Sequence, residues 1–226
     1  MPITRCHYLF LLMAILSHVI ASGVQAQTKS NFEGFFSDFS VGYRNSNTST
    51  SSSLTLNGTV IPSTLSTGQL SNSISVFSAG YNFAIAPSYI LGIGANISPA
   101  SGQAQPVQAQ ALNQTISLTG IKPLYNYGFF LTPGFEIGDG LAYLKLGTQT
   151  QVNNSNTSPN FYGYLFGLGY KQKIFQSIYL FGEADYAVFS AQTSVKTVST
   201  SGNSINASVT TKPQGNRFLL GLGYQF

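Results

Sequence analysis

The sequence contains few charged residues: Asp, Glu, Lys and Arg make up only 7% of its 226 residues, and tryptophan is absent. Soluble domains carry about a quarter charged residues, so this composition excludes an ordinary water-facing surface. Disorder is also disfavoured, because aromatic residues reach 13% and hydrophobic residues 43%, which gives the chain ample apolar surface to bury. The composition therefore favours a membrane protein.

Beyond its first residues the chain also lacks the run of about 18 to 20 apolar residues that a membrane-spanning helix requires. Irregular backbone cannot face lipid, so a membrane chain without spanning helices must close its strands into a barrel. The segment 1–26 begins with Arg5, continues through an apolar core and ends in a cleavage-like motif at Gly23–Ala26. This arrangement predicts a cleaved secretory signal peptide, followed by a barrel domain over 27–226.

The predicted mature chain has neither cysteine nor histidine, because Cys6, His7 and His18 all lie in the signal segment. Disulfides, thiolate nucleophiles, imidazole bases and His/Cys metal sites are thereby excluded. The acidic pair Glu183 and Asp185 lies on a strand pattern that indicates no substrate cleft, so ion pairing is favoured over acid-base catalysis. We therefore expect no enzyme, no cofactor and no metal site; haem, which would need tyrosine ligands, ranks last.

Eight segments of the mature chain alternate apolar with small or polar residues, the period-two pattern of strands in a transmembrane barrel. They cover roughly 34–45, 73–85, 89–98, 114–137, 141–152, 161–171, 178–190 and 217–226. The fourth contains Pro123 and Pro133, which cannot donate to a ladder and indicate a bulge or a locally unpaired position. The sequence thus predicts an all-β fold, an eight-stranded antiparallel up-and-down transmembrane β-barrel.

The connections between these segments alternate in length. Short turns are expected near Ala86–Ser88, Gly138–Gly140 and Lys173–Ser177. Four longer connections rich in Ser, Thr, Asn and Gln, at 45–73, 99–113, 153–160 and 191–215, are expected to be hydrated loops without packed structure. This alternation is typical of bacterial outer-membrane barrels with extracellular long loops. We therefore expect a location in a Gram-negative outer membrane, with both mature termini in the periplasm.

Several motifs carry a family resemblance. They are Tyr125–Phe135, Leu144–Gly147, Phe166–Tyr170, Glu183–Tyr186 and Leu222–Phe226. Their order and spacing resemble those of small eight-stranded outer-membrane proteins of the OmpA/OmpX-like type, in the porin family of barrel domains. The resemblance implies a C-terminal signal that the outer-membrane insertion machinery reads, formed by Leu220, Leu222, Tyr224 and Phe226. The chain ends at the eighth strand, so we do not expect the peptidoglycan-binding domain of full-length OmpA-type proteins.

Eight charged side chains fall on the predicted inward face of the barrel: Asp38, Arg44, Glu136, Lys145, Lys171, Glu183, Asp185 and Arg217. Side chains fill the interior of an eight-stranded barrel, so these charges are expected to pair across a narrow lumen. We expect a salt-bridge network whose main members are Glu136, Lys145, Glu183 and Arg217. It either plugs the lumen or gates an ion path; glycine and serine at other inward positions leave room for the second interpretation.

The favoured function is a non-enzymatic structural or surface role: envelope integrity, surface antigen, or adhesion through the extracellular loops. The alternatives are a narrow channel for ions or small solutes, and loop-mediated binding of a ligand or host factor. Expected partners are outer-membrane lipid, lipopolysaccharide phosphates near Lys196 and Lys212, the insertion machinery, periplasmic chaperones and host surface molecules. Nucleic acid is not expected, because the few basic residues form no cluster, and a monomer is the default.

Overall fold

The computed structural model describes residues 30–56, 59–61, 64–67, 70–99, 107–111, 114–118, 123–153, 160–200 and 203–226. The predicted signal peptide, 1–26, lies outside this part of the chain. All regular structure in the described ranges is β, and they contain no helix of a length and hydropathy that would cross a membrane.

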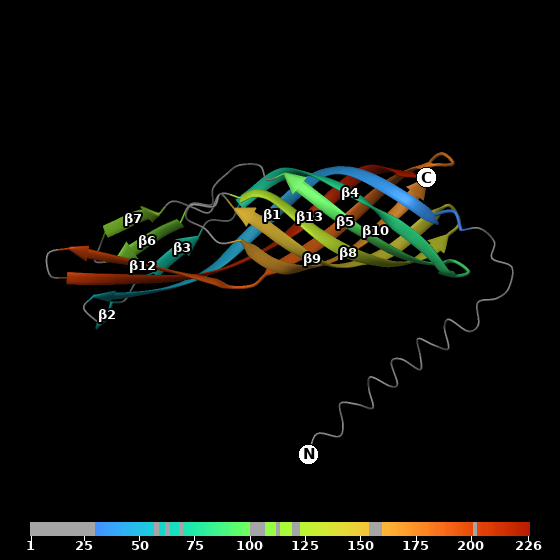
Figure 1. Ribbon diagram of the computed structural model, residues 1–226. Coiled ribbons are helices and arrows are strands. Elements are labelled where there is room, and N and C mark those ends of the chain that lie inside the picture. Colours follow the sequence, from blue (N-terminus) through green and yellow to red (C-terminus); the bar gives the residue numbers. More distant parts are fainter. Residues whose placement is uncertain are drawn as a thin grey trace, which may run out of the picture.

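Eight strands form a closed antiparallel barrel (Figure 1). They are β1 (Gly34–Leu56), β4 (Leu70–Ala86), β5 (Tyr89–Pro99), β8 (Pro123–Ile137), β9 (Gly140–Asn153), β10 (Phe161–Lys173), β11 (Ile178–Phe189) and β13 (Asn203–Gln225). Each pairs with the next barrel strand along the chain, and β1 pairs with β13, which closes the ring. The predicted fold class is confirmed.

The barrel is apolar on the outside and largely polar on the inside. Along β1, Phe35 and Phe39 are 65% and 56% exposed, whereas Asp38 and Ser40, the two neighbours of Phe39 in the chain, are buried. The same alternation follows β4, β5, β10, β11 and β13, with the inward and outward faces that the sequence predicts. Only a hydrocarbon surrounding makes this inverted distribution stable, so the exterior is a lipid-facing surface.

Aromatic side chains gather near both ends of the barrel strands. At one end the rings form close pairs: Phe35 with Tyr81, Tyr81 with Phe83, Tyr89 with Phe135 and Tyr224 with Phe226, at centroid distances of 4.6 to 5.1 Å. At the other end lie exposed tyrosines, among them Tyr43, Tyr125, Tyr127, Tyr162 and Tyr164. A tyrosine ring is apolar while its hydroxyl takes water, so these girdles mark two membrane interfaces without tryptophan.

Three short connections lie at one end of the barrel, the turn end: 87–88, 138–139 and 174–177. Gly138 has a φ of +60°, a left-handed backbone conformation that glycine adopts without steric cost, and the predicted tight hairpin is confirmed. The turns are hydrogen-bonded around the rim, as when the Lys173 amide donates to the Asp139 carbonyl at 2.9 Å. Both ends of the described chain lie at this end too: the C-terminus is labelled in Figure 1, and Ser30 bonds Glu136, next to the turn at 138–139.

The fourth predicted strand, 114–137, is wrong as a single element. The structure contains two strands there, β7 (Gln114–Leu118) and β8, which begins at Pro123. The register between β8 and β9 shifts between Pro123 and Tyr125, whereas Pro133 leaves the register unchanged and only lacks a pair on β9. Proline has no N–H to donate, so it disrupts a ladder on the side where that N–H would be needed. Both expected forms of disruption thus occur, one at each proline.

The opposite end, the loop end, carries more strand structure than the sequence predicts. β1 and β13 are each 23 residues long and pair from Phe36↔Gln225 to Leu56↔Ile205, far beyond their barrel neighbours. β2 (Thr59–Ile61) and β12 (Gln192–Thr200) flank them, so a four-stranded ribbon projects from the barrel (Figure 1). A separate sheet of β3 (Thr64–Thr67), β6 (Val107–Ala111) and β7 lies next to β1. The expectation of loops without packed structure is wrong for these residues.

Candidate functional site

The lumen contains three buried ion pairs, at successive levels from the turn end to the loop end. They join Lys171 to Asp38, Lys145 to Glu183, and Arg217 to Asp185. Each of the six side chains is at most 8% exposed. The structure therefore brings together six of the eight charges that the sequence places inside the barrel.

The middle pair is the most completely bonded. Lys145 Nζ lies 2.7 Å from Glu183 Oε1, and the Tyr143 hydroxyl donates to Glu183 Oε2 at 2.9 Å. The ammonium group also lies 4.5 Å from the centre of the Phe130 ring, within the range of a cation–π contact. Both carboxylate oxygens thus have a donor, as a buried charge requires.

The pair nearest the turn end is enclosed by aromatic rings. Lys171 Nζ lies 3.3 Å from Asp38 Oδ2 and 3.2 Å from the hydroxyl of Tyr179, which itself donates to Asp38 Oδ1. The same ammonium lies 4.4 Å from the centroid of Phe36 and 4.7 Å from that of Tyr179. Aromatic rings and hydrogen-bond acceptors thus surround the ammonium group together.

Two glycines on β10 explain how residues two strands apart can meet. Gly167 pairs with Lys145 on β9 and with Asp185 on β11, and Gly169 pairs with Tyr143 and Glu183 in the same way. A Cβ at Gly169 would lie 2.4 Å from the Tyr143 ring. Since β10 offers no side chain at these inward positions, groups on β9 and β11 cross over it. These two glycines therefore make room for the side chains of the ion pairs.

Below the ion pairs, a cluster of apolar side chains fills the turn end of the lumen. Its buried members are Phe32, Ile90, Leu141, Tyr143, Tyr179 and Phe181. Phe32 precedes the first strand and is fully buried, with its ring 6.0 Å from that of Tyr179. The sequence analysis missed this residue, because it lies outside any alternating segment. Tyr143 and Tyr179 were also not predicted as lumen residues. Period-two alternation could have identified them, because Tyr143 shares a strand face with Lys145 and Tyr179 shares one with Glu183.

Glu136 lies at the turn-end rim and is not part of the three ion pairs. The Ser30 hydroxyl donates to Glu136 Oε1 at 2.5 Å, and the Phe32 amide donates to the same oxygen at 3.1 Å. The carboxylate therefore holds the segment before β1 across the end of the barrel, with Phe32 pointing inward. The expectation that Glu136 is a main member of the lumen salt-bridge network is wrong, since no ion pair of the described residues includes it.

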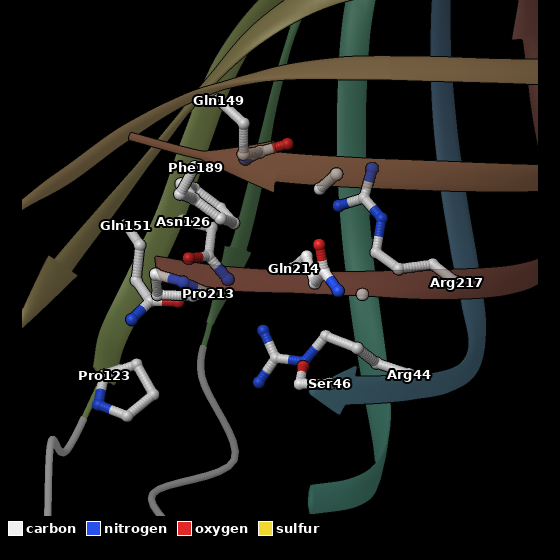
Figure 2. Close-up of a pocket in the computed structure, with 12 residues that line it drawn as sticks. Arg44, Ser46, Pro123, Asn126, Gln149, Gln151, Phe189, Pro213, Gln214 and Arg217 are labelled. Carbon is white, nitrogen blue, oxygen red and sulfur yellow. The ribbon is translucent and has the colours of Figure 1, made fainter. Parts of the chain in front are cut away.

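Above the ion pairs the lumen opens into a cavity at the loop end, the loop-end vestibule (Figure 2). Its volume is about 50 Å³, room for a few water molecules, and residues of β1, β8, β9, β11 and β13 line it. Arg44 lies here, half-buried, and its Nε donates to Asn72 Oδ1 at 3.3 Å. Between the two deeper ion pairs, in contrast, there is room for about one water molecule.

The four residues of the expected insertion signal lie on the outward face of β13. Leu220 and Phe226 are 72% and 73% exposed, and Leu222 and Tyr224 also face outward. Their role in insertion stays a prediction. In the described residues, no group of three or more His, Cys, Asp or Glu side chains is placed to hold a metal ion.

No family model and no curated protein matches the chain. Among solved structures, the outer membrane protein OprG from Pseudomonas aeruginosa is similar, with a TM-score of 0.58 and 17% identity over 86% of this chain and 97% of that one. The outer membrane protease OmpT from Escherichia coli has a TM-score of 0.47 and 10% identity over 89% and 99% of the two chains. Ail, the attachment invasion locus protein of Yersinia pestis, has a TM-score of 0.34 and 15% identity over 86% and 99%. The similarity to OprG shows the fold, that of a small outer-membrane barrel.

Proposed function

We propose that this chain is a closed, non-enzymatic barrel of a bacterial outer membrane whose role lies in the surface it presents at the loop end. The observation that carries the proposal is the filled lumen, in which three buried ion pairs stand above an apolar cluster. The interior of an eight-stranded barrel is just wide enough for side chains, so no open channel is left once they fill it. The barrel then serves as an anchor and a rigid support.

The proposed orientation puts the turn end in the periplasm and the projecting ribbon outside the cell. Short turns on one side and long connections on the other support it, as does the position of both described chain ends beside the turns. The ribbon is also too polar for lipid: the β1 stretch beyond the barrel begins Asn47-Thr48-Ser49-Thr50-Ser51. A sheet of such composition is stable only in water.

The ribbon offers hydroxyl groups and positive charge to a partner. The hydroxyls of Thr193 and Thr210 lie 2.8 Å apart on adjacent strands, and Lys212 is exposed near the barrel rim. A lysine near the outer rim of the barrel would lie close to the lipopolysaccharide phosphates and could bind them. A sheet rich in hydroxyl groups is suited to hydrogen bonds with host surface molecules. We therefore place envelope integrity and adhesion in this ribbon, ahead of a narrow channel for ions or small solutes, which the filled lumen disfavours.

Removing the ribbon is expected to abolish adhesion without affecting the barrel. The variant replaces 48–68 and 191–211 with two short Gly-Asn turns. These cuts leave the barrel pairing intact, because β1 pairs with β4 only as far as Ser46↔Leu70, and β11 pairs with β13 only as far as Val188↔Gln214. The measurement is adherence to an epithelial cell layer of a non-adherent Gram-negative strain that carries either form. Equal amounts of both barrels in the outer membrane, with the same heat-dependent gel shift, provide the control. Adherence that survives the replacement, or is absent with the full chain, would contradict the proposal.

A further inference from the structure

The lumen carries one more positive charge than its ion pairs neutralise. All six acidic residues of the chain lie in the described ranges, and three of them, Glu33, Glu136 and Asp139, lie at the turn end. The other three accept Lys145, Lys171 and Arg217. Arg44 is the remaining lumen cation, and no ion pair of the described residues includes it. An unneutralised guanidinium is therefore present at the loop-end vestibule.

The position of Arg44 makes this charge costly. Arg44 and Arg217 are direct partners in the β1–β13 ladder, and like charges directly opposite one another destabilise a sheet. Asp185, on the far side of Arg217, binds Arg217 Nη2 at 2.5 Å. Two guanidinium groups thus face one another, and in the described residues the one nearby carboxylate bonds only Arg217. A further anion beside Arg44 would remove the repulsion.

Other polar groups of the same cavity are buried without a protein partner. Gln149 is 2% exposed, and neither its amide nitrogen nor its amide oxygen has a hydrogen-bond partner in the protein. The same holds for Oδ1 of Asn126 and Nε of Arg217. Buried polar groups are nearly always bonded, and Figure 2 shows these side chains together with Arg44 around one space. The cavity is therefore equipped to bind a polar group.

Part of the vestibule lining is apolar. Phe189 and Ala187 of β11 line it and pack with Phe161 and Leu165, which are at most 1% exposed. Pro213 of β13 adds a further apolar surface. The cavity thus offers a cation, unpartnered amides and an apolar surface, a combination that suits a ligand with one charged end.

We infer that the loop-end vestibule binds a small organic oxyanion. The acid group, a carboxylate or a chemically similar phosphate or sulfate, is bound by Arg44. The apolar body packs on Pro213 and Phe189 and extends toward the unpartnered amide of Gln149 on the far side of the cavity (Figure 2). The filled lumen beneath makes this a blind site for binding rather than an entrance for transport. Binding at this site does not depend on the ribbon, so it is tested separately from the proposed adhesive function.

The arginine content of the chain allows a direct test. Arg44 and Arg217 are the only arginines after residue 26, so the arginine Nε–Hε region of a ¹⁵N–¹H spectrum shows two signals from the processed protein. The Arg44→Gln variant assigns them. The full chain is expressed in a Gram-negative outer membrane, purified in maltoside micelles and titrated with benzoate, benzamide and inorganic phosphate. Benzoate has an acid group and an apolar body, benzamide lacks the charge and phosphate lacks the body.

Saturable shifts of the Arg44 signal are expected with benzoate, at least tenfold weaker ones with phosphate, and none with benzamide. Gln149→Leu, which replaces an unpartnered amide with an apolar group of similar size, is expected to weaken benzoate binding severalfold in a folded barrel. Lys212→Gln, which removes an exposed charge outside the vestibule, is the matched control and should leave binding unchanged. Benzoate shifts that do not saturate, or that benzamide reproduces, would overturn the inference. So would benzoate binding that is weakened by Lys212→Gln but not by Gln149→Leu.

Discussion

Glu183→Ala is expected to lower the free energy of unfolding of the barrel by about 3–5 kcal/mol, because it leaves Lys145 charged and buried without a carboxylate. Lys145 is 3% exposed, and its other close contact is the Phe130 ring, which offers weak compensation. The Tyr143 hydroxyl loses its acceptor as well. The measurement is a guanidinium titration in micelles, followed by strand circular dichroism and by the compact gel position of unheated protein.

A paired substitution separates the cost of an unpaired charge from a general packing defect. Lys145→Met together with Glu183→Leu removes both charges at similar volume, and such replacements of buried ion pairs are often neutral or stabilising. We expect the double variant to recover most of the stability that Glu183→Ala loses. If Glu183→Ala itself unfolds at the same guanidinium concentration as the unaltered chain, Glu183 does not neutralise Lys145 inside the barrel.

Arg217→Ala is expected to cost a similar amount, about 3–5 kcal/mol, because Asp185 is then buried in the lumen without its partner. Asp185 is 4% exposed, and its Oδ1 atom has no hydrogen-bond partner even when Arg217 is present. The same guanidinium titration measures the loss. Since Asp185 is the destabilised group, adding Asp185→Ala to this variant should restore stability in part.

Arg44→Ala provides the matched control, since Arg44 lies opposite Arg217 in the same ladder but outside the ion pairs. Its removal relieves a repulsion between like charges, so the change in stability should stay within about 1 kcal/mol of zero. Equal losses from the two arginine variants would mean that position in the barrel, and not pairing with Asp185, determines the cost.

The sequence predicts which side chains enter the lumen but not which of them pair. Period-two alternation places Lys145 and Glu183 inward with no knowledge of the fold. That they meet depends on the register of β9 and β11 against β10 and on the glycines at 167 and 169, which let the side chains cross an intervening strand. The register is set by the pairing of all strands in the closed ring, so the pattern of a single strand does not predict it.

The features that the sequence analysis missed or misplaced lie at the two ends of the barrel. The ribbon at the loop end consists of Ser, Thr and Asn with few apolar residues, so alternation gave no strand signal there, and backbone pairing of β1 with β13 determines its structure. At the turn end, Glu136 binds the backbone of Phe32 instead of a lumen cation. That contact depends on where the chain before β1 folds back, which local pattern does not specify.

Single-channel recording tests the central claim, that ion pairs and aromatic rings close the lumen. The protein is purified from the outer membrane, shown to be folded by its heat-dependent gel shift, and inserted into a planar lipid bilayer. The filled lumen predicts no current steps above the bilayer background, and it predicts steps from a variant in which Phe130, Tyr143 and Phe181 are all replaced by alanine. Resolved and repeatable current steps from the unaltered barrel would contradict the account and place an ion path through the charged lumen.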